Sequence, residues 1–117
     1  MKFTESHEWV KTPDGHVGIT IHAKQELGEI VFIDFPEVGQ KVKAGEELVV
    51  LESTKAAADI YAPVSGTIIA VNEKLKNDLS LINTDPEGEG WIVQMEISQV
   101  ADLELLLELS DYQTLIT

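Results

Sequence analysis

The residue in this sequence best suited to carry chemistry is a lysine set among small side chains. Lys55 lies in the segment ESTKAAADIYAPVSG (Glu52–Gly66), next to Ser53, Thr54 and the alanines at 56–58. A lysine amine on its flexible stem is an attachment point for a carrier cofactor such as lipoamide or biotin. Small neighbours would let the active site of an attaching enzyme close over the amine. The alternative is an ordinary solubility group, as most exposed lysines are.

Two apolar segments flank this lysine and must position it. They are Leu48–Leu51 (LVVL) and Thr67–Val71 (TIIAV), and their β-branched residues favour strands. We therefore expect an antiparallel hairpin that presents Lys55 at its tip. A helix starting at Ser53 is the alternative, but Pro63 would limit it to about two turns. Isolated helices shorter than about 12 residues are marginal.

The composition limits the possible functions. The chain has 117 residues, 44% of them hydrophobic, which suits one compact domain spanning residues 1–117. Eight basic against 21 acidic residues give a net charge of −13, which disfavours nucleic-acid and membrane-surface binding. The charge would favour partners with basic docking faces, or would only keep the protein soluble and monomeric. The absence of cysteine and of a secretory signal predicts a cytoplasmic protein without disulfides.

The N-terminal half is expected to be mainly β-structure. The Pro13–Gly15 turn predicts a hairpin between residues 9–11 and 16–20. A short helix is expected over Ile21–Leu27, with Thr20 as its N-cap, followed by a strand over Ile30–Phe35. Two further turns, VGQKVKAG (38–45) and APVSGTI (62–68), could mark two halves related by pseudo-symmetry. The expected architecture is a small sandwich or flattened barrel.

The C-terminal half adds a strand and peripheral helices. Alternation predicts a strand over Trp91–Ile97, after a turn or loose helical segment at 72–78 and a loop at 85–90. Ser98 is expected to cap a first helix, and Ser110 with Gln113 to form a capping box for a second. The apolar pattern predicts a break near Leu109. If this pair of helices does not cover Leu105 and Leu109, these leucines become a partner surface.

No metal site and no independent catalytic site are expected. His7-Glu8 resembles the start of a zinc-protease motif, but Lys11 stands where the second histidine would be. His16 and His22 have no second histidine at ligand spacing, so the histidines are expected to be structural or surface residues. The DPEGEG loop lacks the twelfth-position glutamate of a calcium loop.

The segments on both sides of Lys55 resemble those of glycine cleavage system H proteins, in order and at family spacing. The resemblance rests on the segment around Lys55 and on five others: SHEWVK (Ser6–Lys11), VGIT (Val17–Thr20), LGEIVFIDFPEVG (Leu27–Gly39), PVSG (Pro63–Gly66) and INTDPEGEGW (Ile82–Trp91). It implies a mainly β lipoyl fold of the barrel-sandwich hybrid type. It also implies lipoic acid attached through an amide to Lys55. Glu52 and Gly66 match positions that lipoate-attaching enzymes are thought to recognise.

The implied function is that of a carrier and not of an enzyme. The lipoyl arm would carry an aminomethyl group from the pyridoxal-phosphate enzyme glycine decarboxylase to the tetrahydrofolate-dependent aminomethyltransferase, and dihydrolipoyl dehydrogenase would reoxidise it. A lipoate ligase or a lipoyl/octanoyl transferase would attach the arm. The alternatives are a lipoyl-relay protein that supplies lipoate to 2-oxo acid dehydrogenase complexes, and an unmodified interaction domain. Biotin carriage is disfavoured because the methionines typical of biotinyl domains do not flank Lys55.

The resemblance further implies a cleft in which the loaded arm docks. Its polar contacts match Glu8 and Asp59, and a third position, a histidine in plant members, corresponds to Glu26. Glu8 and Asp59 could instead be ordinary solvated residues at strand edges. The chain departs from the family pattern at Glu26 and at three further positions: Thr54, Ala58 and Gln94.

Overall fold

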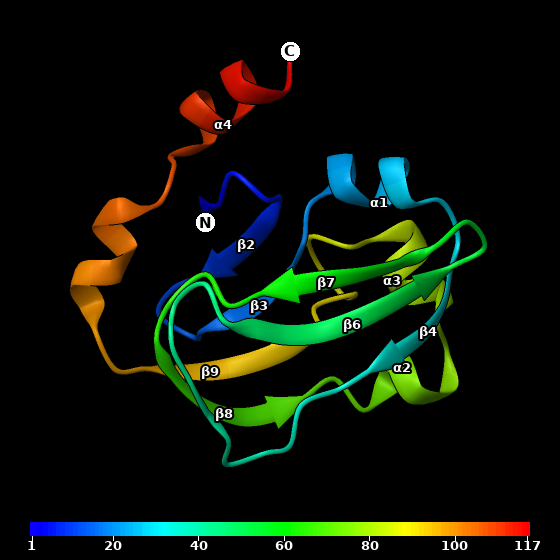
Figure 1. The fold of residues 1–117 in the computed structure, drawn as a ribbon, viewed down its shortest axis with the longest axis horizontal. Helices are drawn as coiled ribbons and strands as arrows, with labels where there is room; N and C mark the ends of the chain where they lie inside the picture. The colour runs from blue at the N-terminus through cyan, green and yellow to red at the C-terminus, as the bar shows by residue number, and fades with distance from the viewer.

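A computed structural model describes residues 1–117 as two antiparallel β-sheets with short helices around them (Figure 1). The larger sheet has the strand order β1-β2-β3-β9-β8-β5, and the smaller has the order β4-β6-β7. The strands of the larger sheet are β1 (Lys2–Phe3), β2 (Glu8–Lys11), β3 (His16–Ile19), β9 (Val93–Ile97), β8 (Gly66–Val71) and β5 (Lys41–Val42). Those of the smaller sheet are β4 (Ile30–Asp34), β6 (Glu47–Ser53) and β7 (Ala57–Tyr61). The mainly β fold class is confirmed.

The N-terminal hairpin and the helix after it form as predicted. β2 pairs with β3 so that Trp9 lies opposite Gly18. A Cβ at Gly18 would lie 2.8 Å from a ring carbon of Trp9, so the absent side chain makes room for the indole. Helix α1 spans Ile21–Leu27, and the Thr20 hydroxyl caps it by accepting a hydrogen bond from the Ala23 amide at 3.1 Å.

The hairpin that carries Lys55 belongs to the smaller sheet. β6 and β7 pair antiparallel from Glu47 opposite Tyr61 to Glu52 opposite Ala57, and Lys55 lies in the turn between them. The predicted tip is confirmed, but the predicted second strand is not the partner. The segment 67–71 lies in β8 of the other sheet, and the alanine-rich β7 takes its place.

The two turns singled out as a pseudo-symmetric pair lie against each other. β5 in the first turn pairs with the start of β8 in the second, with Lys41 opposite Thr67 and Val42 opposite Gly66. The amide of Gly45 donates to Ala62 O at 2.8 Å, and the amide of Ala62 donates to Glu46 O at 2.8 Å. These two bonds extend the β6–β7 ladder at the end remote from Lys55.

The core lies between the sheets. One cluster of 20 buried residues draws on both sheets and includes Val10, Ile33, Leu51, Ile68 and Met95. A second cluster of three buried aromatic residues, Phe3, Trp9 and Tyr112, ties the N-terminal strands to the last helix. Rings of Phe3 and Tyr112 stack with centroids 4.8 Å apart.

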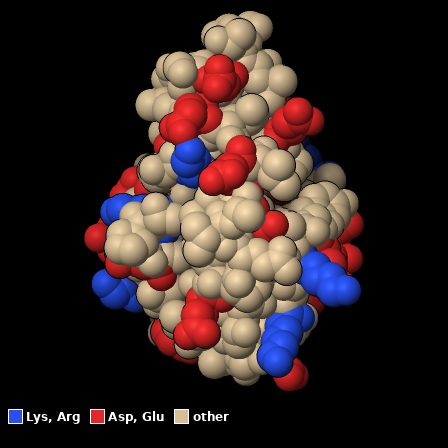
Figure 2. Space-filling model, turned by 90° about the vertical axis from the view of Figure 1, so that its left-hand side faces the viewer, with Lys and Arg blue, Asp and Glu red and all other residues tan.

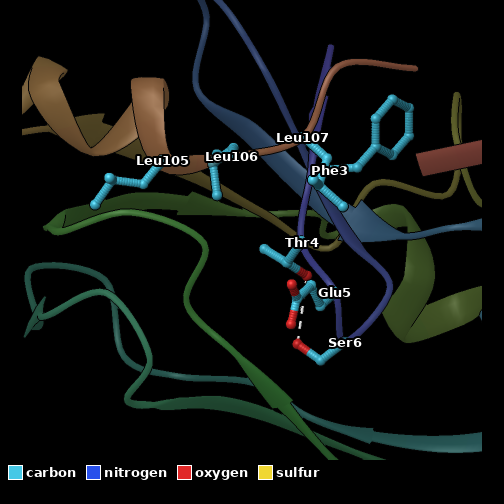
Figure 3. Close-up of a pocket in the computed structure, with 7 residues that line it drawn as sticks. All are labelled: Phe3, Thr4, Glu5, Ser6, Leu105, Leu106 and Leu107. Atoms are coloured by element: carbon cyan, nitrogen blue, oxygen red, sulfur yellow. Dashed lines mark hydrogen bonds between the residues drawn. The ribbon is translucent and has the colours of Figure 1, made fainter. Parts of the chain in front are cut away.

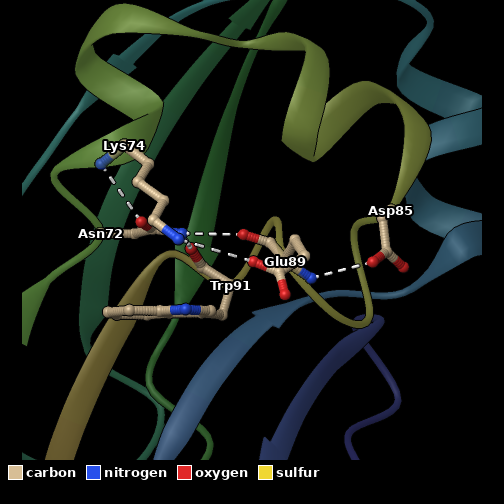
Figure 4. A network of polar contacts seen from close by, with 5 residues as sticks. All are labelled: Asn72, Lys74, Asp85, Glu89 and Trp91. Carbon is tan, nitrogen blue, oxygen red and sulfur yellow. Dashed lines mark hydrogen bonds and ion pairs between the residues drawn. The ribbon is translucent and has the colours of Figure 1, made fainter.

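Helices α2 (Lys74–Asn77) and α3 (Ser80–Thr84) follow β8 and lead into the loop at residues 85–90. Figure 4 shows how buried Asn72 holds this loop: its amide donates to Glu89 O at 2.9 Å and to Trp91 O at 2.7 Å. The Asp85 carboxylate accepts a bond from the Glu89 amide at 2.9 Å. This carboxylate is used inside the turn, as expected for a plain loop. Helix α3 was not predicted.

The C-terminal segment leaves the sheets as the 3₁₀ helix η1 (Val100–Leu105) and helix α4 (Leu109–Ile116), which lie at the periphery (Figure 1). The pair of helices is confirmed, but both predicted caps are wrong. Gln99 precedes η1 and Glu108 precedes α4, and neither cap residue makes a side-chain capping bond. Leu103 and Leu106 pack on the core, whereas Leu105 is 83% exposed. None of the helices has the length and apolar character needed to cross a membrane.

Candidate functional site

The tip of the β6–β7 hairpin is a tight turn held by one serine. The Ser53 amide donates to Ala56 O at 2.8 Å, and the Ser53 hydroxyl oxygen accepts bonds from the amides of Lys55 and Ala56, both at 3.1 Å. The Lys55 side chain is exposed, and its amine makes no hydrogen bond and no ion pair. The structure therefore fixes the backbone at this position and leaves the amine free.

The tip is also attached to the end of helix α1, a contact that the sequence analysis missed. The Thr54 amide donates to Glu29 O at 3.0 Å. Gly28 ends the helix with φ 83°, and a Cβ there would lie 3.4 Å from Lys55 Cε. The lysine stem thus runs past a residue with no side chain. Gly28 thus both ends the helix and leaves room for the lysine stem.

The two positions matched to attaching-enzyme recognition differ in exposure. Glu52 is exposed on β6, where it pairs with Phe32 and Ala57 on the neighbouring strands. Gly66 is buried at the start of β8, and it does not have the positive φ that a turn glycine would have. A Cβ at Gly66 would lie 2.2 Å from Glu96 O, so close packing of strands requires glycine here.

The two carboxylates matched to arm docking also differ. Glu8 is only 1% exposed, and its carboxylate accepts bonds from Thr4 Oγ1 at 2.5 Å and Ser6 Oγ at 2.6 Å. It also accepts a longer bond from the Tyr61 amide at 3.4 Å, on the strand that carries Asp59. Asp59 is exposed on β7. Glu8 thus has hydrogen-bond partners of its own, and Asp59 is open to solvent.

Glu26 lies on the exposed side of α1, where it contacts a histidine of the same helix. Glu26 Oε1 contacts His22 Nε2 one helical turn earlier. The ring of His22 in turn lies beside that of His7, with centroids 4.7 Å apart. The two histidines, unrelated in sequence spacing, are therefore neighbours. Their spacing in the sequence did not indicate this contact.

A surface hollow of about 480 Å³ lies beside the Glu8 loop but does not contain Glu8. Figure 3 shows its lining, which comes from the two ends of the chain: Phe3–Ser6 and Leu105–Leu107. Neither Asp59 nor Glu26 reaches it. We find no structural feature that links this hollow to Lys55.

Two ionisable groups of the C-terminal segment have shifted pKa values. Burial, together with the nearby carboxylates of Glu87, Glu26 and Glu8, raises the pKa of Tyr112, against the opposing effect of its hydrogen bond to Thr20. A hydrogen bond from Lys2 lowers the pKa of the exposed carboxyl of Glu108.

Figure 2 shows one face of the molecule, on which acidic side chains are scattered with uncharged surface between them.

The fold and the site together define a class of protein. A two-sheet domain that fixes one hairpin turn and leaves its lysine amine free is suited to carry a covalently attached group between enzymes. Comparison with known proteins gives the family. The family model described as glycine cleavage H-protein matches residues 1–117, and the chain therefore belongs to this family.

Individual members of the family align with this chain over nearly their whole length. The glycine cleavage system H protein of Thermotoga maritima is 55% identical over 114 residues, which cover 96% of this chain and 92% of the relative. That of Coprothermobacter proteolyticus is 50% identical, with 99% and 94% covered. The crystal structure of the H protein from Mycobacterium marinum superposes with a TM-score of 0.87 at 40% identity, covering 97% of this chain and 93% of that one.

This family carries a lipoyl-lysine, and its members are components of the glycine cleavage system without catalytic activity of their own. The chain is accordingly a lipoyl carrier of that system. The predicted family, fold and carrier function are confirmed.

Proposed function

We propose that Lys55 is the lysine that carries the lipoyl group, bound through an amide at Nζ. The observation that carries this proposal is a hydrogen-bonded hairpin tip whose lysine amine has no partner. The neighbouring side chains at Ser53, Thr54 and Ala56 are small, which supports access by an attaching enzyme. When bound, the lipoyl group supplies reversible disulfide–dithiol chemistry. The chain itself holds the attachment point and offers surfaces for docking.

Attachment requires recognition of the hairpin by a lipoate ligase or a lipoyl/octanoyl transferase. Exposed Glu52 at the end of β6 is accessible to such an enzyme. Buried Gly66 is not, so we propose that its effect on recognition is indirect. It acts by keeping β8 close to β9 at Glu96.

The partners we propose are glycine decarboxylase, the tetrahydrofolate-dependent aminomethyltransferase and dihydrolipoyl dehydrogenase, in the bacterial cytoplasm. The family membership and the bacterial relatives support this set. In this system the arm of the carrier would take an aminomethyl group from the first enzyme to the second.

We propose that Asp59 is the docking carboxylate that a loaded arm meets first, because it is exposed on β7, close along the chain to the Lys55 turn. Glu8 would contribute by fixing the local backbone through Thr4, Ser6 and Tyr61, and would face the arm only if these bonds rearranged. Glu26 is the third proposed contact, and it would act together with His22.

Replacement of the lysine tests the attachment site. Lys55→Arg keeps the charge, so the fold should be unchanged, but arginine cannot form the amide. Intact-mass analysis after treatment with lipoate ligase should show one lipoyl group on the wild type and none on the variant. The matched control is Lys43→Arg, in the turn on the opposite side of the molecule, which should be lipoylated normally. A lipoyl group on the Lys55→Arg protein would overturn the proposal.

A further inference from the structure

Three side chains that the sequence separates come together beside helix α1. His7 lies in the loop before β2, while His22 and Glu26 lie one turn apart on α1. Each offers a possible ligand atom, and these atoms all lie within 4.8 Å of one another. Donors bound to one tetrahedral zinc ion at about 2.1 Å are roughly 3.4 Å apart, so small side-chain rotations would suffice. Glu26 is 63% exposed and free to make such a movement.

The backbone of His7 is held in a conformation that residues with a side chain rarely adopt. Its φ is +73°, the only positive value at a residue other than glycine. The His7 amide donates to Thr4 O at 3.2 Å, and the Thr20 amide donates to His7 O at 3.0 Å. A left-handed residue persists only when its surroundings enforce it, and such residues cluster at functional sites. Here the conformation directs the His7 ring to helix α1.

A second residue fixes the ring of His7. Its Nδ1 lies 2.8 Å from the Tyr112 hydroxyl, which lies 2.7 Å from Thr20 Oγ1. When Nδ1 carries the proton, His7 donates to the tyrosine oxygen, and Nε2 has a free lone pair. A ligand histidine commonly donates its other N–H to a neighbouring acceptor in this way. Tyr112 is buried, so the orientation is enforced by packing as well.

We propose that His7, His22 and Glu26 form a binding site for one divalent transition metal, Zn²⁺ in the first instance, with Tyr112 as the positioning residue for His7. Two imidazoles and one carboxylate are a common protein ligand set for zinc, and they leave a fourth position to water. The metal would join the N-terminal loop to α1 at a single point.

Zinc titration of the full-length, untagged protein without lipoate tests this proposal. The chain has no cysteine and only three histidines, so competing sites are few. Isothermal titration should show one Zn²⁺ per chain, and Co²⁺ should give the visible absorption of a four-coordinate site. Glu26→Gln and His22→Ala should each weaken binding at least tenfold. Tyr112→Phe should weaken it about 10–100-fold, as loss of a partner that orients a ligand commonly does.

The third histidine is the matched control. His16 also lies near a carboxylate, with Nδ1 3.9 Å from Asp14, but it has no second histidine beside it. His16→Ala should bind zinc as the wild type does. Glu26 is exposed, so Glu26→Gln should fold normally even if His22→Ala or Tyr112→Phe does not. Circular dichroism of each variant without metal shows whether it is folded. Absence of one-to-one binding, or equal affinity in the wild type and Glu26→Gln, would overturn the proposal.

Discussion

Glu8 shows that a carboxylate in this protein can serve the fold. It is buried, and it accepts two side-chain hydroxyl bonds and one backbone bond. A buried group that loses well-matched partners costs about 1–3 kcal/mol. Glu8→Gln replaces one acceptor oxygen with an amide donor, and should therefore lower the free energy of unfolding by about that amount. Asp59→Asn, at an exposed site, should change it by less than about 0.5 kcal/mol.

Urea unfolding of both variants measures this difference, and functional assays separate it from docking. If Asp59 meets the loaded arm, Asp59→Asn should speed spontaneous loss of the carried one-carbon group, measured as formaldehyde release. Equal unfolding free energies for the two variants would contradict the structural role of Glu8. Equal release rates for Asp59→Asn and wild type would contradict the docking role of Asp59.

For single residues, the sequence predicted the features that depend on the immediate neighbours in the chain. Lys55 stands out because its neighbours are small, and the structure leaves its amine free. The meeting of His7 with His22 could not be predicted from spacing, because it depends on how the loop before β2 folds over α1. Likewise, Gly66 lies in a segment that reads as a turn, but glycine is required there because strand β9 lies too close for a side chain.

Among the elements, helix α4 depends on one aromatic residue for its attachment. Tyr112 is 3% exposed, stacks on Phe3 and bonds to Thr20 and His7. Removing a buried aromatic side chain costs about 3–5 kcal/mol, so Tyr112→Ala should lower the free energy of unfolding by that order. Leu115→Ala, on the exposed side of the same helix, should have little effect. Chemical denaturation followed by tryptophan fluorescence reports the loss, because Trp9 belongs to the same cluster.

The outcome that contradicts this view is equal stability of Tyr112→Ala and Leu115→Ala. It would mean that α4 lies on the surface without contributing to the fold. Circular dichroism of both variants shows whether the helix itself persists.

Element prediction succeeded where propensity and tertiary structure agree. Thr20 followed by a helix-favouring segment predicted α1 correctly. Prediction of elements failed where tertiary contacts determine whether a segment forms a strand or a helix. Residues 57–61 are rich in alanine and were not predicted as a strand, but the backbone ladder with β6 makes them one. Helix α3 was missed because a contact distant in the sequence stabilises it. The side-chain amide of Asn83, within α3, donates to Ile30 O of β4 at 3.1 Å, and its Oδ1 accepts from the Ile30 amide at 2.9 Å.

For the molecule as a whole, the net charge of −13 predicts how it meets its partners. The acidic residues do not form one dense patch on the face in Figure 2, so any steering would come from the summed field. The Debye length falls from about 10 Å at 0.1 M salt to about 3 Å at 1 M. Association rates with glycine decarboxylase, measured by stopped flow, should therefore fall about tenfold or more across this range. A flat response would mean that the charge serves solubility alone.

The contact between Phe3 and Leu107 has a consequence for synthesis on the ribosome. The Phe3 amide donates to Leu107 O at 2.9 Å, and Phe3 O accepts from the Leu107 amide at 2.7 Å, so the first strand is paired by a residue that is synthesised much later. At about 5–20 residues per second, the interval between the two is roughly 5–20 s. During that time Phe3 and Trp9 have no Tyr112 to cover them. The nascent chain therefore lacks the aromatic cluster that ties its N-terminal strands to helix α4 until α4 has been made.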